Sequence, residues 1–368
     1  MIKKIFAETL FTGTQALREH TVSYENGIIT SIEAGLADEG ITQVPFLSAG
    51  FNDIHINGGE RFHFTDKADY ETVGDINDSS LKLGTAYTLP ALITSSTDNI
   101  YKGIDAVRQY RKENPDSGIL GIHLEGPFLN PAKRGAHIKE FVRKPLDKEL
   151  GEIISYGRDV IKMITVAPEV LSPDQLEMLT SSGIIVSAGH SDATYEQASA
   201  AFGSGVKLVT HLYNAMSPLL HRNPGLVGAT FDHDEVYAPI ILDGIHCDFP
   251  AARIAYKIKR EKLFLISDAL FTGGKVERFE WLGFNAYLIN GQYINSEGNL
   301  AGANIALADA VRNAVNEVQI PLQEAVEMAT LRPAKALKLD DTIGKIEPGY
   351  PAVFTAFDHS LLNFRVVK

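Results

Sequence analysis

The sequence predicts an α/β fold in which a barrel of parallel strands is joined to a small, separate β sheet. The first observation is that apolar runs recur from Phe51 onward, with amphipathic or Ala-rich segments between them. The second is that residues 1 to about 48 read as strands and show no helical period. The third is the length of 368 residues, which suits a barrel with an accessory domain.

The strands are predicted from a hairpin signal and from the recurring apolar runs. Residues 20–33 alternate around Asn26-Gly27, a dipeptide typical of a type I′ hairpin. Eight apolar runs follow, the number that a closed (β/α)₈ barrel needs. They are residues 51–56, 85–93, 119–125, 162–167, 184–189, 207–211, 239–242 and 263–267. Eight such repeats without a Gly-rich phosphate-binding fingerprint favour the barrel over an open doubly wound sheet.

Helices are predicted between these strands and after the last one. They cover residues 100–112, 173–180, 192–202, 250–259, 304–318, 321–330 and 333–339. A second hairpin signal, Asn290-Gly291, lies in the long connection that follows Asp268. The tail, residues 343–358, returns to a β pattern. We therefore expect it to complete the N-terminal sheet.

Charge and composition exclude several classes of partner. The formal net charge is −12 and the chain has no long basic run, which argues against nucleic acid. The only cysteine, Cys247, excludes an intrachain disulfide and fits a reducing compartment. No stretch has the length of a signal-peptide core or a membrane span. We expect a soluble cytoplasmic protein with neither a membrane nor a nucleic acid as partner.

Four chemically active side chains stand where predicted strands end. His190 and His211 close two successive strands of a βαβ unit, so both belong to the carboxyl edge of the sheet. Glu125 and Asp268 close two further apolar runs. A carboxylate there is costly to bury unless it is paired or binds a cation. Either histidine alone is more simply a strand cap, but the four together outline a hydrolytic metal site.

The motifs around these residues resemble one family. They are HLEGPF (123–128), KRGAH (133–137), AGHSDA (188–193), THLYNAM (210–216), NPGLVG (223–228), DGIHCD (243–248), SDA (267–269) and LAG (300–302). They occur in the order found in N-acetylglucosamine-6-phosphate deacetylases of the amidohydrolase superfamily. The resemblance spans nearly the whole chain, and HLEGPF with THLYNAM is its most specific part.

This resemblance implies a fold, a metal site and a reaction. Residues 1–48 and 345–368 would form a small β-sandwich domain, and residues 49–344 a catalytic (β/α)₈ barrel. Glu125, His190 and His211 would bind one divalent ion per subunit, with zinc the first choice and iron, cobalt or manganese the alternatives. Asp268 would be the catalytic acid and base that helps to release acetate from N-acetylglucosamine 6-phosphate.

The resemblance also implies how the phosphorylated amino sugar binds. The residues implied in its binding are Ala136, His137, Asn214, Ala215, Arg222, His246, Ala301 and Gly302. Arg222, with the backbone of Asn214 and Ala215, would hold the phosphate. In relatives this arginine reaches across from a neighbouring subunit, so a homodimer is expected. His137 or His246 would help to stabilise the oxyanion.

One departure from the superfamily pattern bears on a second metal. Many members carry His-x-His after the first barrel strand, whereas this chain has His55-Ile56-Asn57. His55 could support a second, weaker ion. Three alternatives stay open: a deacetylase of a related N-acetyl amino sugar, a cyclic amidohydrolase, and a non-catalytic sensor of amino-sugar phosphates. The cyclic amidohydrolases need the second histidine and often a lysine on the fourth strand, where Glu169 follows Pro168 here.

Overall fold

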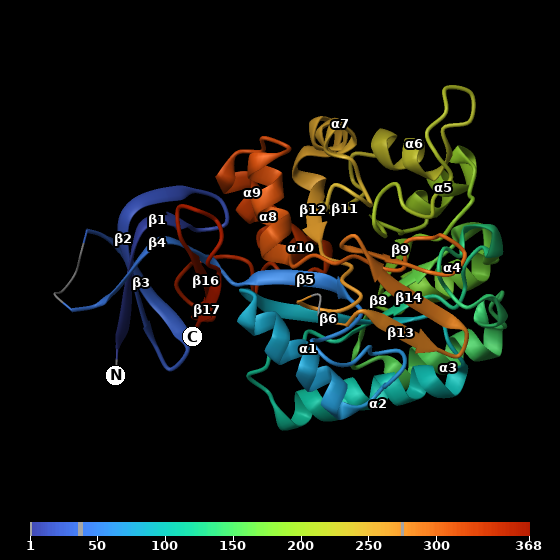
Figure 1. The fold of residues 1–368 in the computed structure, drawn as a ribbon, viewed down its shortest axis with the longest axis horizontal. Coiled ribbons are helices and arrows are strands. Elements are labelled where there is room, and N and C mark those ends of the chain that lie inside the picture. The colour runs from blue at the N-terminus through green and yellow to red at the C-terminus, as the bar shows by residue number, and fades with distance from the viewer. Residues whose placement is uncertain (1, 36–39, 274–275) are drawn as a thin grey trace.

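The computed structural model describes residues 2–35, 40–273 and 276–368, and both chain ends belong to one six-stranded sheet beside the barrel (Figure 1). Its strands are β1 (Lys3–Phe11), β2 (Ala16–Glu25), β3 (Ile28–Ala34), β4 (Thr42–Ala49), β16 (Phe354–Phe357) and β17 (Arg365–Val367), in the order β17-β16-β4-β1-β2-β3. The hairpin at Asn26-Gly27 joins β2 to β3, and β16 pairs antiparallel with β4. Both predictions are therefore confirmed. The closure of this sheet into a sandwich stays a prediction.

Eight parallel strands follow, consistent with the predicted barrel. They are β5 (Phe51–Ile56), β6 (Thr85–Ile93), β7 (Ile122–Glu125), β8 (Ile161–Val166), β9 (Ile185–Ala188), β10 (Leu208–Val209), β11 (Ala238–Ile241) and β12 (Leu263–Ile266). The first six form a sheet in the order β10-β9-β8-β7-β6-β5, and β11 pairs with β12. Parallel bridges join Leu208 to Tyr237 and Ile56 to Ala269, so the two sheets meet at both edges. All residues of β5, β11 and β12 are buried, as expected for strands covered on both faces.

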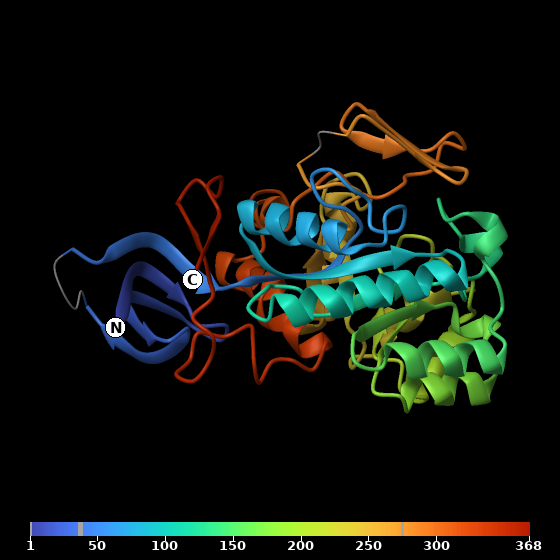
Figure 2. The same cartoon turned by 90° about the horizontal axis from the view of Figure 1, so that it is seen from below.

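The longer helices pack outside these strands (Figures 1 and 2). They are α1 (Tyr70–Lys82), α2 (Thr97–Glu113), α3 (Asp147–Gly157), α4 (Pro173–Thr180), α5 (Tyr195–Gly203), α6 (Gly225–Asp232), α7 (Phe249–Lys259), α8 (Leu307–Asn316), α9 (Leu322–Ala329) and α10 (Leu331–Ala336). Seven of them match the predicted helices to within three residues at each end. The other three, α1, α3 and α6, were not predicted. In α1 the buried face carries Thr72, Asp75, Asn77 and Ser79, so an apolar stripe is weak in the sequence. Among the described residues, no helix has the length and apolar character that a membrane crossing requires.

A small antiparallel sheet follows Asp268 and lies over one side of the barrel (Figure 2). It contains β13 (Arg278–Trp281), β14 (Phe284–Ile289) and β15 (Gln292–Ile294). The hairpin at Asn290-Gly291 joins β14 to β15, as predicted, whereas β13 was not predicted. Its buried face includes Phe279 and Phe284, which join Leu270 and Phe271 in a hydrophobic cluster separate from the barrel core.

Candidate metal and substrate site

Four candidate residues lie at the carboxyl ends of barrel strands. Glu125 is the last residue of β7, while His190, His211 and Asp268 each stand two residues beyond β9, β10 and β12. The three latter residues have left-handed backbone, with φ of 47°, 36° and 48°. This conformation is uncommon for residues other than glycine and clusters at functional sites.

Glu125, His190 and His211 meet in a tight triangle. Glu125 Oε1 lies 3.0 Å from His190 Nε2 and 3.1 Å from His211 Nε2, and the two nitrogens are 3.1 Å apart. All three side chains are at least 90% buried. In tetrahedral zinc sites, bonds of 2.0–2.1 Å place neighbouring ligand atoms about 3.3 Å apart. The triangle therefore has the spacing of a metal-ligand set.

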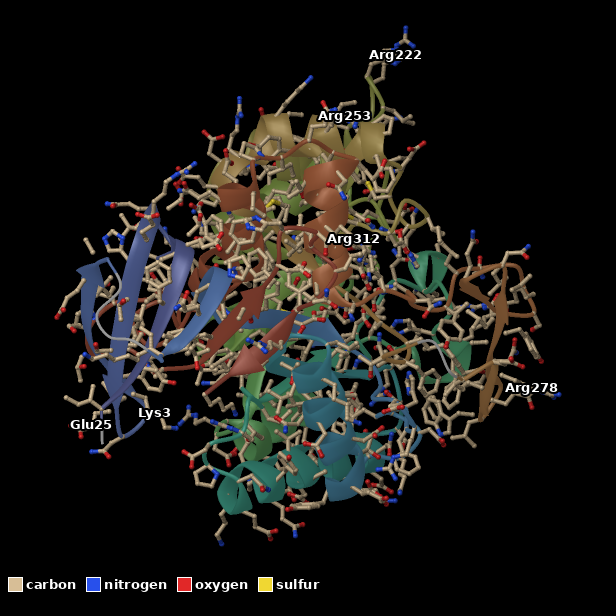
Figure 3. All side chains as sticks on the ribbon, turned by 60° about the vertical axis from the view of Figure 1, so that its left-hand side comes forward. Lys3, Glu25, Arg222, Arg253, Arg278 and Arg312 are labelled. Carbon is tan, nitrogen blue, oxygen red and sulfur yellow. The ribbon has the colours of Figure 1, made fainter. Side chains whose placement is uncertain are left out.

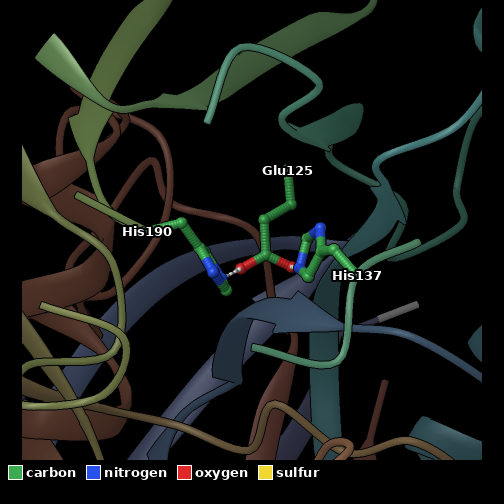
Figure 4. A group of neighbouring side chains, drawn as sticks. All are labelled: Glu125, His137 and His190. Carbon is green, nitrogen blue, oxygen red and sulfur yellow. Dashed lines mark hydrogen bonds and ion pairs between the residues drawn. The ribbon is translucent and has the colours of Figure 1, made fainter. Parts of the chain in front are cut away.

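The hydrogen bonds made by the rings of His190 and His137, which both lie beside the Glu125 carboxylate in Figure 4, also favour a cation. His190 Nδ1 lies 2.9 Å from the carbonyl oxygen of Lys133, which can only accept, so Nδ1 carries a proton. His137 Nδ1 lies 2.8 Å from Thr94 Oγ1, whose own proton goes to the carbonyl of Glu125. In the neutral rings, Nε2 of both histidines therefore presents a lone pair toward the Glu125 carboxylate. Lone pairs that converge in a buried site are stabilised by a positive ion.

Two sets of residues could hold such an ion. The ligand atoms of Glu125, His137 and His190 all lie within 4.8 Å of one another, and His137 Nε2 is 3.7 Å from Glu125 Oε2. The triangle with His211 is tighter, so we favour it. Burial alone would raise the pKa of Glu125, but the positive charge of His55 and the hydrogen bond that His55 donates hold it well below its usual range. Glu125 is therefore ionised and suited to ligate a cation.

His55 and Asp268 lie beside this triangle. His55 Nε2 is 3.2 Å from Asp268 Oδ1 and 3.3 Å from Glu125 Oε2. Burial lowers the pKa of His55, but the carboxylates of Asp268 and Glu125 outweigh burial and raise it to about 9. Asn57, which stands where other superfamily members have the second histidine, donates from Nδ2 to Asp268 Oδ1 at 2.8 Å. Asn57 thus orients the Asp268 carboxylate.

A cavity of about 680 Å³ opens above these residues. The sequence-predicted residues that line it are Glu125, Ala136, His137, His190, His211, Asn214, Ala215, His246, Asp268, Ala301 and Gly302. Arg222 is absent from its lining. It is exposed, and in Figure 3 it projects from the tip of a loop away from the body of the molecule. Within one chain, the structure therefore does not bring Arg222 to the other predicted site residues.

His246 is held in place by Asp243. Its Nδ1 lies 2.7 Å from Asp243 Oδ2, and Asp243 Oδ1 accepts the backbone N–H groups of Ile245 and His246. Burial raises the pKa of Asp243, but the side-chain hydrogen bond from His246 and the backbone hydrogen bonds from Ile245 and His246 contribute to lowering the pKa below its usual value. An Nδ1–H that points to Asp243 leaves Nε2 of a neutral His246 as an acceptor.

His137 likewise has its Nδ1 occupied, by the hydrogen bond to Thr94 Oγ1. Burial lowers the pKa of His137 to about 3. A role of either histidine in stabilising an oxyanion stays a prediction.

The sequence motifs gave no role to His63, which also lines the cavity. Its ring is stacked on Phe279, with the ring centroids 4.8 Å apart, and its Nδ1 accepts the Thr65 N–H at 3.3 Å. Burial lowers the pKa of His63 to about 3. A lone histidine in the sequence carries no sign of this environment, because Phe279 comes from a sheet more than 200 residues later in the chain.

This buried histidine predicts a component of the pH dependence of stability. In the unfolded chain a histidine binds a proton as the pH falls below about 6.5, whereas folded His63 does so only near 3. The unfolded state therefore binds more protons than the folded state between these two pH values. As the pH falls through this range, the free energy of unfolding decreases by about 1.4 kcal/mol per pH unit. We expect His63→Gln to remove this component. Between pH 7 and 4.5 the free energy of unfolding should therefore decrease less steeply for the variant than for wild type. Urea unfolding at several pH values measures it.

The exposed His359 provides the control for this experiment. His359→Gln should keep the wild-type slope of stability against pH. Equal slopes for wild type and His63→Gln would contradict the predicted role of His63.

The chain matches the Amidohydrolase family over residues 46–367. It is 36% identical to the N-acetylglucosamine-6-phosphate deacetylase of Haemophilus influenzae, an alignment that covers 97% of this chain and 95% of the relative. It is 34% identical to the N-acetylgalactosamine-6-phosphate deacetylase of Shewanella sp. (strain ANA-3), covering 93% and 89%. These findings confirm the resemblance that the motifs indicated.

Solved structures agree in fold. The N-acetylglucosamine-6-phosphate deacetylase of Pasteurella multocida superposes with a TM-score of 0.94 at 33% identity, covering 98% of this chain and 96% of the other. A mutant of the Mycobacterium smegmatis enzyme, in complex with N-acetyl-D-glucosamine-6-phosphate, has a TM-score of 0.91 at 27% identity, with 98% and 96% covered. The similarity thus spans both the barrel strands and the terminal sheet.

Proposed function

Because the chain belongs to the amidohydrolase family, we propose that it removes the N-acetyl group of N-acetylglucosamine 6-phosphate and releases glucosamine 6-phosphate and acetate. Its family and relatives identify it as a hydrolase that acts on amide bonds. The N-acetylgalactosamine-6-phosphate deacetylases among the relatives make the galactosamine epimer the second candidate substrate.

One observation carries this proposal. The carboxylate of Glu125 and the Nε2 atoms of His190 and His211 converge within about 3 Å of one another in the lining of a cavity, which Asp268 also lines. An amide is a poor electrophile and water is a poor nucleophile. Glu125, His190 and His211 would hold a divalent ion, with zinc the first choice, and such an ion would supply polarisation of a carbonyl and activation of water near neutral pH. A sensor of amino-sugar phosphates would not need this arrangement.

Other side chains would transfer protons and bind the substrate. Asp268, oriented by Asn57 at 2.8 Å, would accept the proton of the attacking water and pass it to the leaving amine. His137 and His246 would accept hydrogen bonds from the substrate through Nε2, since their Nδ1 atoms are occupied. His55, with Asn57 in place of a second histidine, would add at most a weaker second ion site.

A panel of substrates tests the proposed reaction. Acetate release is measured from N-acetylglucosamine and N-acetylgalactosamine, each with and without the 6-phosphate, and from a cyclic amide. We expect turnover of the phosphorylated glucosamine derivative to have the largest kcat/KM. Binding of the sugar phosphate without acetate release would support a sensor instead, and turnover of the cyclic amide would support a cyclic amidohydrolase.

Phosphate recognition by Arg222 requires a second subunit in this proposal. Arg222 is exposed on a projecting loop, near the exposed Leu219 and Leu220. We therefore propose a homodimer in which Arg222 reaches the cavity of its partner. The chain would work in the cytoplasm, with residues 1–48 and 345–368 as a β-sandwich domain and residues 49–344 as the catalytic barrel.

Replacing Arg222 by Ala should weaken substrate binding selectively. A charge-assisted contact to phosphate is worth about 1.5–3 kcal/mol, so KM for the phosphorylated sugar should rise roughly 10- to 100-fold. The contact persists through the reaction, so kcat should change little. Steady-state kinetics with the phosphorylated and unphosphorylated sugars measure both effects. Arg365→Ala, a change of another exposed arginine, is the control. Equal losses on both sugars would contradict a role in phosphate binding.

A further inference from the structure

We propose that Glu169 is a positioning residue for His190, whose carboxylate fixes both the turn that carries the ring and the loop that orients it. Glu169 lies in a short 3₁₀ turn (Pro168–Val170) directly after β8. Neither the sequence motifs nor the proposed mechanism gives it a role. The inference rests on the proposed function, because it concerns the same ion site.

The carboxylate of Glu169 accepts three hydrogen bonds. Oε1 accepts from Asn130 Nδ2 at 2.8 Å and from the backbone N–H of Asp192 at 2.7 Å. Oε2 accepts from Ser191 Oγ at 2.7 Å. A half-buried carboxylate thus joins a loop after β7 to the turn after β9.

All three donors belong to segments that hold His190. Ser191 and Asp192 follow it directly in the chain. The backbone N–H of Asn130 donates to the carbonyl of His190 at 3.0 Å, and the same loop supplies the Lys133 carbonyl that accepts from His190 Nδ1 at 2.9 Å. The hydrogen bonds of Glu169 therefore restrain His190 at its backbone and, through Lys133, at its ring.

His190 needs such restraint because the strand does not supply it. The residue stands beyond the end of β9 with a φ of 47°, a conformation that persists only where the surroundings impose it. Its Nε2 must nevertheless remain about 3 Å from both Glu125 and His211. The bond from Nδ1 to Lys133 also determines which nitrogen presents the lone pair. Groups that orient a metal-binding histidine in this way typically contribute a factor of about 10–100 to metal affinity.

Two substitutions separate positioning from charge. Glu169→Ala removes all three acceptors, so the dissociation constant for zinc should rise about 10- to 100-fold. Glu169→Gln keeps an oxygen for Asn130 and Asp192, and its amide can donate to Ser191 Oγ, because a hydroxyl also accepts. The Gln variant should therefore bind zinc within about threefold of wild type, well inside the range of the Ala loss. Zinc affinity is measured on metal-free protein by competition with a chromophoric chelator.

Controls distinguish failure of this inference from failure of the proposed function. Glu177→Ala changes an exposed glutamate on neighbouring α4 and should leave zinc affinity unchanged. A wild type that binds no zinc would overturn the proposed function itself. A wild type that binds zinc, with Glu169→Ala equal to it, would overturn only the role of Glu169. A Gln variant as weak as the Ala variant would also overturn positioning, since the negative charge would then be what matters.

A third variant covers the case in which Glu169→Ala does not fold. Ser191→Ala removes one of the three donors and leaves the carboxylate in place. We expect it to weaken zinc binding by a smaller factor than Glu169→Ala, in the lower part of the range of about 10–100. Unchanged zinc affinity in a folded Ser191→Ala protein would overturn the inference.

Discussion

Replacing Asp268 by Asn should lower kcat by roughly 10²–10⁴, the usual contribution of general acid–base catalysis, while zinc and substrate still bind. The Asn side chain has the same shape and can keep its oxygen where Asn57 Nδ2 donates at 2.8 Å. It cannot accept the proton of a water molecule at neutral pH. Measurement of kcat, substrate affinity and zinc content on the same preparation separates loss of proton transfer from loss of the ion.

The outcome also distinguishes two roles of Asp268. If it were mainly a metal ligand, the Asn variant would lose zinc, and excess zinc would restore activity. A variant with full zinc and near wild-type kcat would remove Asp268 from the mechanism. Asp174→Asn, a change of an exposed aspartate in the first turn of α4, controls for the substitution itself.

Replacing His211 by Ala should abolish tight zinc binding and, with it, activity. We expect wild-type protein to hold about one equivalent of zinc through three protein ligands. Removing His211 leaves Glu125 and His190, and two ligands rarely hold zinc against a chelator. Elemental analysis after dialysis against chelator measures the loss, and His359→Ala, at an exposed histidine, should retain the ion.

The same measurement tests the second ion site. His55 Nε2 lies 3.2 Å from Asp268 Oδ1 and 3.3 Å from Glu125 Oε2. Because His55 is not one of the three proposed ligands of the first ion, His55→Ala should leave the first equivalent in place. About two tightly held equivalents in wild type, one of them lost in His55→Ala, would contradict a single-ion enzyme. Retention of zinc by His211→Ala would instead favour the alternative set of Glu125, His137 and His190.

The sequence by itself determined which strands carry the candidate site. Uninterrupted apolar runs indicate strands buried on both faces, and β5 and β6 begin and end where the runs predict. Parallel strands bring their carboxyl ends to one rim. The positions of Glu125, His190, His211 and Asp268 at strand ends therefore predicted that these four residues come together. Asn-Gly dipeptides likewise located both hairpins, because their turn geometry is local.

Only the tertiary structure decided which atoms face one another. The proton on His190 Nδ1 follows from the Lys133 carbonyl, and the low pKa of His63 follows from burial against Phe279. The proposed positioning role of Glu169 follows from its hydrogen bonds to Ser191 and Asn130, which lie 22 and 39 positions away in the chain. Arg222, placed by its motif among the substrate contacts, lies outside the cavity of its own chain. Such contacts join residues distant in sequence, and hydrophobic periodicity reports the face on which a residue lies, not its partner across space.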